Sequence, residues 1–371
     1  VGLTEGCGTY NHPYVIIKGS QLATLAKTIN GTAIPESLRL PKVTVKNADD
    51  RVSLGDNKKH RCLDEAECAE FTYSETNKRY EYKENTTTYY WDREQVRHYL
   101  AGAYYLIDND ITITAKDNYP GLGAPATDGT QGQFSFRGVI VGSGSGHTIT
   151  NKTKRTDITD TTNANTMGLI TMSNGSVIKN LTIKVELQDS DLYNYKSNEN
   201  IAYAYDEKFP NYGAVINKVM GGDNIIDNVR VQYVDKDGGS VDFKVLNAND
   251  YKAVVGGYVG VVVNGGLIFR NIENSYLTGF NVVKVDAGGV KQDVVIDDVN
   301  LTDGGKDLQH GDDLSHLYVN PFVGRVINGY AFLETEGTYA FSENGRDGDG
   351  TTRSGAVLTT LKNTTKNYSI P

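Results

Sequence analysis

The stretch GSVIKNLTI at residues 175–183 has the same residue order as two later segments, GDNIIDNVRV at 222–231 and GLIFRNIEN at 266–274. Each segment begins with glycine, continues through apolar residues and reaches an asparagine that another apolar residue follows. Alignment on this residue makes Asn180, Asn228 and Asn271 equivalent, and a large apolar residue stands two places before each. The chain therefore contains an internal repeat.

Two further segments extend the alignment. HTITNKT places Asn151 at the repeated position, and VVIDDVNL places Asp298 there. The step is 29 residues from Asn151 to Asn180 and 27 from Asn271 to Asp298. A period of this size is typical of one coil of a parallel β-solenoid. We expect the asparagines Asn151, Asn180, Asn228 and Asn271 to stack in a ladder, each amide donating to one neighbour and accepting from the other.

The predicted fold class is all-β, a right-handed parallel β-helix with an N-terminal capping helix and a polar inserted subdomain. Forty glycines and 24 tyrosines in 371 residues, with only three methionines, favour strands and turns. Near-continuous valine and isoleucine, as in VVGGYVGVVV from residue 254, indicates strands covered on both faces. An antiparallel sandwich with turns at similar spacing is the alternative.

Four regions follow from the pattern. Residues 1–40 predict a strand and a helix with Ser20 as N-cap and Asn30 and Gly31 as the stop. Residues 41–100 are charged and tyrosine-rich and predict an inserted subdomain or long hairpin. We expect residues 101–340 to form the β-helix and residues 341–371 to form a C-terminal loop and a linker to a following module. The sequence begins with Val1 instead of methionine and ends at LKNTTKNYSIP without an anchor or sorting signal. We therefore expect a piece of a larger protein.

Tyrosine-rich segments are the candidate binding residues. In the insertion, aromatic residues alternate with charges and could form a protein-facing patch, or they could only pair with one another across a hairpin. Two polar insertions, at 188–212 and 234–252, predict loops projecting from the coils, where binding tends to reside. The candidate ligand-binding residues are Tyr80, Tyr82, Tyr89, Tyr90, Trp91, Tyr193, Tyr195, Tyr203 and Tyr205.

The sequence contains only three cysteines and few candidate metal ligands. Cys62 and Cys68 could form a local disulfide, Cys7 could pair with either one, or all three could be free thiols. His60 lies near Cys62 but completes no zinc tetrad. The segment DGDGTTR at 347–353 offers two acids without the remaining ligands of a calcium loop. We expect no metal and no cofactor.

Four segments in order resemble the β-helical surface-protein modules called GLUG-like: PYVIIKGSQLATLAKTING at 13–31, YYLIDNDITI at 104–113, FSFRGVIVGSGSGHTITN at 134–151 and GLITMSNGSVIKNLTI at 168–183. The match covers residues 13–186 without the insertion and continues more loosely to about 337. It departs where Leu169 and Ile170 replace the usual leucine and phenylalanine. The resemblance implies a parallel β-helix from a secreted or wall-attached protein of Gram-positive gut bacteria. It also implies extracellular binding, since similar proteins include immunoglobulin-binding, superantigen-like ones.

A catalytic function has one main candidate segment, QHGDDLSH at 309–316. The adjacent carboxylates Asp312 and Asp313, with His310 and His316 beside them, resemble in type the paired acids of β-helical polysaccharide-cleaving enzymes. The segment GSGSGHT with His147 has the glycines of a phosphate cradle but lacks the following lysine and helix, so it predicts a turn.

The net charge of −9 and the absence of a long basic run argue against nucleic acid, and no apolar stretch is long enough to predict membrane insertion. We expect a monomeric, non-catalytic binding module, an adhesin whose partner is a host protein or glycoprotein such as immunoglobulin. The alternatives are a β-helical polysaccharide hydrolase or lyase and a structural stalk module.

Overall fold

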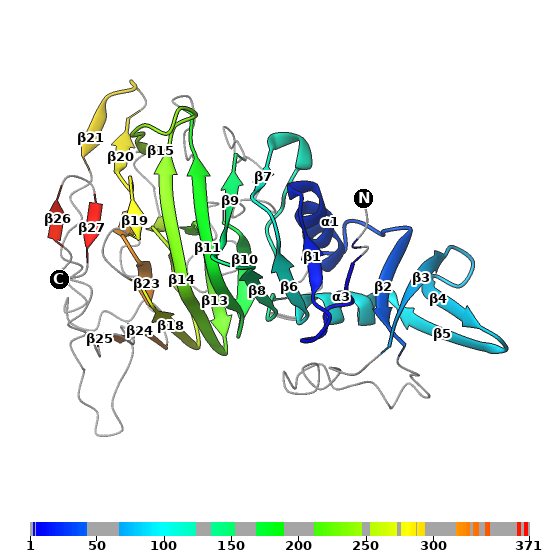
Figure 1. Ribbon diagram of the computed structural model, residues 1–371. Coiled ribbons are helices and arrows are strands. Elements are labelled where there is room, and N and C mark those ends of the chain that lie inside the picture. The colour runs from blue at the N-terminus through cyan, green and yellow to red at the C-terminus, as the bar shows by residue number, and fades with distance from the viewer. Residues whose placement is uncertain are drawn as a thin grey trace, which may run out of the picture.

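The computed structural model describes residue 3 and residues 5–42, 67–123, 135–152, 168–188, 211–246, 253–272, 276–286, 288–293, 317–326, 329–333, 338–341, 362–364 and 367–369. Strands dominate these residues and most of them pair in parallel, so the predicted all-β class is confirmed. Figure 1 shows the strands following one another across the molecule, from the N-terminal helix to the C-terminal strands.

The largest sheet contains seven strands that lie side by side in parallel. In spatial order they are β1 (Tyr14–Ile16), β6 (Tyr104–Ile107), β8 (Val139–Gly142), β11 (Val177–Glu186), β14 (Asp223–Val234), β18 (Gly266–Arg270) and β24 (Tyr330–Leu333). β7 (Ile111–Ile113) and β9 (His147–Asn151) extend the sheet beside the second half of β11, and β25 (Thr338–Phe341) pairs antiparallel to β24.

Two smaller sheets contain only parallel strands, and most of these strands come from the same chain segments that supply strands to the largest sheet. One contains β10 (Ile170–Asn174), β13 (Ile216–Gly221), β17 (Val259–Val262) and β23 (Val323–Val326). The other contains β12 (Asn211–Gly213), β16 (Ala253–Gly256) and β22 (Leu317–Asn320). Three successive segments thus each add one strand to each sheet in the same order: β12, β13, β14, then β16, β17, β18, then β22, β23, β24.

The remaining strands form short additions. β15 (Phe243–Leu246) pairs in parallel with β20 (Val282–Val285), which pairs with β21 (Lys291–Asp293). β19 (Leu277–Thr278) pairs with β14 and β27 (Asn367–Ser369), and β27 pairs with β26 (Lys362–Thr364). The segment 234–252 is therefore not a simple projecting loop, since Phe243 within it is buried on the tyrosine-lined core.

The core lies between the sheets and is filled by apolar and aromatic side chains from successive segments. Every residue of β17 is buried, as expected for a valine-rich strand covered on both faces. Phe269 packs edge-on against Tyr258 and Phe322, with ring centroids 5.7 Å away in each case. Tyr258 is fully buried and its hydroxyl donates to the Val229 carbonyl at 2.7 Å.

The repeated asparagines adopt the left-handed conformation that the repeat predicts for a tight turn. Asn180, Asn228 and Asn271 have φ of 60°, 51° and 51°. Asn228 Nδ2 donates to Asn180 Oδ1 at 2.5 Å, whereas Asn271 Nδ2 donates to Asp227 Oδ1 at 2.6 Å. Asn180 and Asn228 are therefore linked directly by their amides, whereas the amide of the third asparagine, Asn271, donates to the Asp227 carboxylate.

One of the aligned positions, Asn151, lies elsewhere. Asn151 pairs with Val185 in the register of β9 and β11, so it is not stacked on Asn180. The Asn180 amide instead lies beside Gly142, 3.5 Å from its carbonyl oxygen, because a turn at 143–146 separates β8 from β9. Asp298 lies outside the described residues; the described strand next to β18 on the side away from β14 is β24, where Phe269 pairs with Leu333.

Helix α1 (Gly19–Ile29) covers the N-terminal end of the sheets (Figure 1) and contacts β1 and β7. Its buried face includes Leu22, Leu25 and Ile29, as the spacing predicts. Its N-cap is Lys18, not Ser20, because Gln21 Oε1 accepts from the Ile17 and Lys18 N–H groups at 2.9 and 3.1 Å. A Cβ on Gly19 would lie 2.0 Å from the Thr112 carbonyl oxygen, so glycine permits the close contact with β7.

The predicted insertion at 41–100 contains three strands of a four-stranded antiparallel sheet, whose first strand begins before residue 41, and most of a helix. The strands are β2 (Ser37–Pro41), β3 (Cys68–Ser74), β4 (Arg79–Glu84) and β5 (Thr87–Asp92), in that spatial order. Helix α3 (Arg93–Ala101) follows directly and packs on α1. Sequence reasoning missed α3, although Asp92 and Gln95 have the spacing of a capping box, and Gln95 Oε1 accepts from the Asp92 N–H at 2.9 Å.

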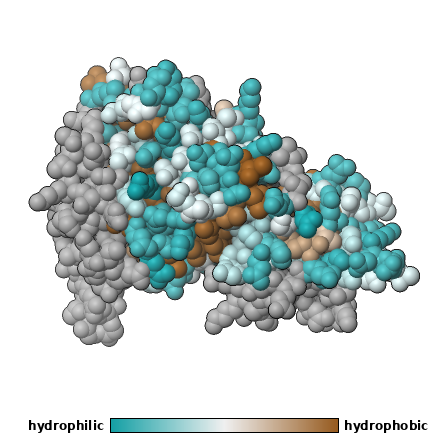
Figure 2. Space-filling model, viewed as in Figure 1, coloured by the Kyte–Doolittle hydropathy of each residue, from teal (hydrophilic) through white to brown (hydrophobic). Residues whose placement is uncertain are grey.

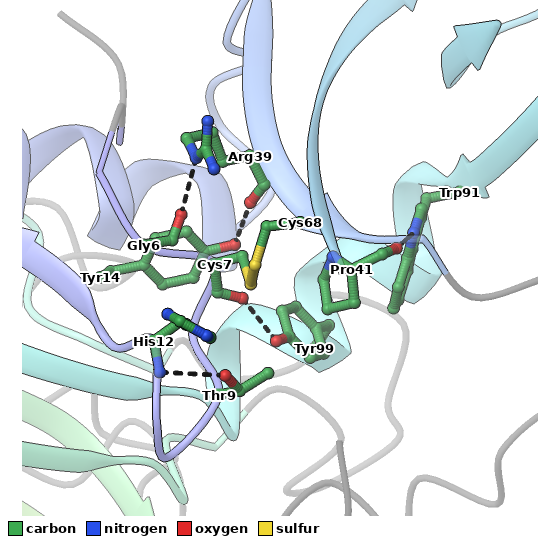
Figure 3. The surroundings of a disulfide bond; sticks show 10 residues. All are labelled: Gly6, Cys7, Thr9, His12, Tyr14, Arg39, Pro41, Cys68, Trp91 and Tyr99. Carbon is green, nitrogen blue, oxygen red and sulfur yellow. Dashed lines mark hydrogen bonds between the residues drawn. A yellow bond between two sulfur atoms is a disulfide. The ribbon is translucent and has the colours of Figure 1, made fainter. Parts of the chain in front are cut away.

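A disulfide between Cys7 and Cys68 joins the N-terminal loop to β3 (Figure 3). Around it, the Tyr99 hydroxyl donates to the Cys7 carbonyl at 2.5 Å and Arg39 Nε donates to the Gly6 carbonyl at 3.2 Å. Of the pairings that the sequence leaves open, the structure forms Cys7 with Cys68, and Cys62 lies outside the described residues. The antiparallel sheet is thus fixed to the rest of the molecule at its base.

None of the helices in the described ranges has both the length and the apolarity that a membrane crossing requires.

Candidate binding surface on the tyrosine-rich sheet

The hairpin of β4 and β5 carries the candidate aromatic residues and projects from the body of the molecule (Figure 1). Its cross-strand pairs include Tyr80 with Trp91 and Tyr82 with Tyr89. Because side chains alternate along a strand, these four rings share the face that packs on the core, whereas Tyr90 lies on the opposite face. The five predicted residues therefore do not form one patch.

Two of the four rings are buried at the base of the sheet. Tyr80 is 2% exposed and its hydroxyl donates to the Pro35 carbonyl at 2.9 Å. Trp91 is 7% exposed, donates from Nε1 to the Pro41 carbonyl at 3.0 Å and packs on Tyr99. Burial raises the pKa of Tyr80 well above its usual range. Neither residue is available to a partner, so their place in a protein-facing patch is wrong and the hairpin-pairing interpretation holds for them.

The other two rings are half-buried toward the tip of the hairpin. Tyr82 lies 5.7 Å from Phe71 and 6.1 Å from Tyr89, measured between ring centroids. Lys42 Nζ lies 5.3 Å from the Tyr82 ring and forms an ion pair with Glu84 at 2.9 Å. Partly exposed tyrosine rings are typical of protein-binding surfaces, whereas lysine and glutamate are not enriched there.

The opposite face of the sheet presents Tyr90 among charged groups. Arg79 stacks over the Tyr90 ring, with the guanidinium carbon 4.1 Å from the centroid, and Nε donates to Glu81 at 2.8 Å. This bond lowers the pKa of Glu81, which stays ionised and holds Arg79 in place. In the view of Figure 2 the described surface of the sheet is mainly hydrophilic, with patches of intermediate hydropathy.

The other candidate residues lie outside the described residues: the loop tyrosines Tyr193, Tyr195, Tyr203 and Tyr205, the candidate catalytic groups His310, Asp312 and Asp313, and the possible calcium segment at 347–353.

A second constellation, which sequence reasoning did not assemble, lies on two adjacent turns of the parallel region. The Ser143 hydroxyl donates to Asp108 and lies 3.0 Å from His147 Nε2. His147 Nδ1 lies 3.3 Å from Asp110 Oδ1, which also accepts from the Thr148 N–H at 2.8 Å. The Thr148 bond first, and then His147, lower the pKa of Asp110.

The direction of the hydrogen bonds decides what this turn cluster can do. In a nucleophilic triad the serine hydroxyl donates to the histidine. Here the single proton of the Ser143 hydroxyl is directed to Asp108 and not to His147 Nε2. The arrangement fits a hydrogen-bonded link between two turns and not an activated nucleophile. The signal in the sequence was the spacing of Asp108 and Asp110 in LIDNDI, but nothing local indicated that these residues face Ser143 and His147.

Among the described residues, no group of three histidine, cysteine or acidic side chains has the geometry of a metal site.

Comparison with known proteins gives no match among protein-family models, curated proteins or solved structures.

Proposed function

We propose that the chain is an extracellular binding module of a bacterial surface protein, built as a right-handed β-solenoid that carries a tyrosine-rich hairpin. The solenoid is supported by three consecutive segments that supply strands to the same three sheets in the same order. The resemblance to GLUG-like surface modules points to the same architecture.

The observation that carries the binding function is the hairpin of β4 and β5. Tyr82 and Tyr89 are half-buried on one face and Tyr90 is held over Arg79 on the other, at the projecting end of a rigid sheet. Tyrosine provides a large contact area with little loss of side-chain entropy, which is why it is enriched at binding sites. The Cys7–Cys68 disulfide agrees with an oxidising, extracellular compartment. The proposed partner is a host protein or glycoprotein such as immunoglobulin.

The test is capture from serum and intestinal fluid by the immobilised protein, followed by mass spectrometry. A double variant, Tyr82→Ser with Tyr89→Ser, should lose capture of the partner. The matched control is Tyr10→Ser, because Tyr10 is 65% exposed but lies outside the hairpin, against Tyr104. This control should capture as the unmodified protein does.

Three results would contradict the proposal. Equal capture by the double variant and the control would place binding on another surface. No capture at all would favour a structural stalk. Cleavage of a polysaccharide, lost in Asp312→Ala and His310→Ala, would favour the hydrolase or lyase.

A further inference from the structure

Strand β5 is the outer edge of the antiparallel sheet. It pairs with β4 on one side, and no strand of the described residues pairs with its other side. An open edge of this kind presents backbone N–H and C=O groups that can pair with another strand. The question is which groups of β5 point outward and what they fit.

The phase of the hairpin identifies the outward groups. The turn has two residues, and Glu84 pairs with Thr87 to close it. A two-residue hairpin closes on a pair that exchanges both backbone hydrogen bonds, and such pairs alternate along an antiparallel ladder. Thr88 and Tyr90 therefore direct their N–H and C=O groups away from β4. The Asp92 N–H, in the same phase, donates to Gln95 Oε1 at 2.9 Å, which agrees with this assignment.

The outward backbone groups lie in a short segment, residues 87–91, that lacks the features that usually protect a sheet edge. Natural edge strands are usually protected by charges, proline or a bulge. Residues 87–91 are Thr-Thr-Tyr-Tyr-Trp and contain no charge or proline, and their pairing with β4 is regular. Thr88 is exposed and Tyr90 is half-exposed. The segment ends before Asp92, because the Asp92 N–H already donates to Gln95 Oε1 in the cap of α3.

We infer that β5 pairs antiparallel with β5 of a second copy of this chain, about a two-fold axis at Tyr89. In this register Thr88 of one copy faces Tyr90 of the other, so each outward N–H and C=O finds a partner. Tyr89 faces Tyr89, and Thr87 faces Trp91. The two sheets become one continuous antiparallel sheet.

The sequence of β5 favours a second copy of this chain as the strand that pairs with its open edge. Read antiparallel against itself, the sequence at 87–91 produces only aromatic–threonine and aromatic–aromatic cross-strand pairs, which are among the favourable ones. No like charges meet, since Asp92 falls opposite Thr86 beyond this segment. The two-fold axis also places like faces together, so that the half-buried rings of Tyr82 and Tyr89 continue across the axis.

The interface is small, so the dimer is expected to be weak. A pairing of five residues per copy lies at the low end of specific interfaces, and dissociation constants of about 10 µM to 1 mM are typical of such contacts. The inference does not depend on the proposed host partner, because it is measured with the purified protein alone.

The first experiment is sedimentation equilibrium of the full chain at increasing concentration, up to about 1 mM. The unmodified protein should dimerise. Tyr89→Lys places like charges face to face at the axis and should raise the dissociation constant at least tenfold, about 1.4 kcal/mol. The matched control is Tyr82→Lys, a tyrosine on the same face and equally half-buried, but on β4; its dissociation constant should change less than that of Tyr89→Lys. A protein that stays monomeric throughout, or equal weakening in both variants, would overturn the inference.

The second experiment tests the register by crosslinking. In a Cys62→Ser background, Tyr89→Cys places two sulfurs at a non-hydrogen-bonded pair with Cα atoms about 4.5 Å apart, within disulfide range. Mild oxidation should produce covalent dimers of this variant. Thr88→Cys, one residue away and facing Tyr90 of the other copy, should give several-fold less. Equal crosslinking of both variants, or none of either, would contradict the two-fold pairing.

Discussion

The parallel region and the antiparallel sheet use tyrosine in different ways. In the parallel region Tyr233 and Tyr258 are fully buried, and their hydroxyls donate to the carbonyls of Gly257 and Val229, both at 2.7 Å. In the antiparallel sheet exposure grows from the buried Tyr80 to the half-exposed Tyr82 and Tyr89.

The difference follows from coverage. Tyr233 lies in β14, which has strands on both sides, and Tyr258 lies between β16 and β17; both rings are enclosed in the core, so only the hydroxyl of each needs a partner. Burial raises the pKa of Tyr258 well above its usual range, which keeps the hydroxyl protonated as a donor. Within the described part of the chain, the hairpin is covered only at its base. The same residue type therefore stabilises the core in one region and provides contact area in the other.

The largest expected effect is the loss of a ring from the parallel core. Phe269→Ala removes a side chain that is 2% exposed and packed between Tyr258 and Phe322, and should lower the free energy of unfolding by about 3–5 kcal/mol. Tyr82→Ala on the hairpin should cost about 1 kcal/mol or less, since the ring is already half in water. Urea unfolding followed by circular dichroism measures both. Equal losses would remove the contrast between the regions.

The disulfide gives the next largest effect and separates the two regions. Cys7 and Cys68 are 61 residues apart, and closing such a loop contributes about 4 kcal/mol in the chain-entropy account. Trp91, the one tryptophan of the chain, lies in the antiparallel sheet. Replacing both cysteines with alanine should lower the urea midpoint of Trp91 fluorescence more than the midpoint of far-ultraviolet circular dichroism, which reports all strands.

Reduction of the unmodified protein should shift the fluorescence midpoint in the same direction, and reduction of the double variant should add no comparable shift. If fluorescence and circular dichroism moved together by equal amounts, the two regions would unfold as one cooperative unit.

The repeat was predictable from the sequence where the motif is local. Ile178, Ile226 and Phe269 lie in register because each belongs to the same short sequence of turn, strand and left-handed asparagine. The alignment failed at Asn151, because a turn at 143–146 divides β8 from β9 and moves Asn151 beside Val185. A motif match detects the residues but not an inserted turn between two strands.

The site was predictable only in part, for a related reason. Composition identified the tyrosine-rich hairpin, but which rings are exposed depends on the phase of alternation, and the two-residue turn between β4 and β5 sets that phase. Tyr80 and Trp91 consequently fall on the base of the core-facing side. The cluster of Asp108, Ser143 and His147 depends on two turns being adjacent in space, and local sequence patterns do not carry that information.

A smaller effect is expected at the asparagine ladder. Asn228 takes φ of 51°, donates to Asn180 and accepts from the Tyr276 hydroxyl at 3.0 Å. Asn228→Gly keeps the backbone conformation and loses these bonds, at a cost of about 1 kcal/mol in the free energy of unfolding. Asn228→Ala adds the cost of a left-handed alanine, about 1 kcal/mol more. Urea midpoints in the opposite order would show that the backbone conformation does not constrain this turn.

The smallest effect concerns the charge of Asp110, whose side chain is 72% exposed. Its folded pKa lies below the ordinary value of 3.8, so its contribution to stability is present above that value and is lost as the pH falls through the lowered folded pKa. Asp110→Asn keeps an oxygen for the Thr148 N–H but loses the carboxylate charge that strengthens this bond, and solvent screening limits the loss to under about 1 kcal/mol near neutral pH. The urea midpoints of the two proteins should converge as the pH falls below 3.8 through the lowered folded pKa of Asp110, because protonation progressively removes the charge that distinguishes them. A difference that persisted or grew at acidic pH would show that the amide disturbs the turn itself, and the link between the two turns would then depend on shape and not on charge.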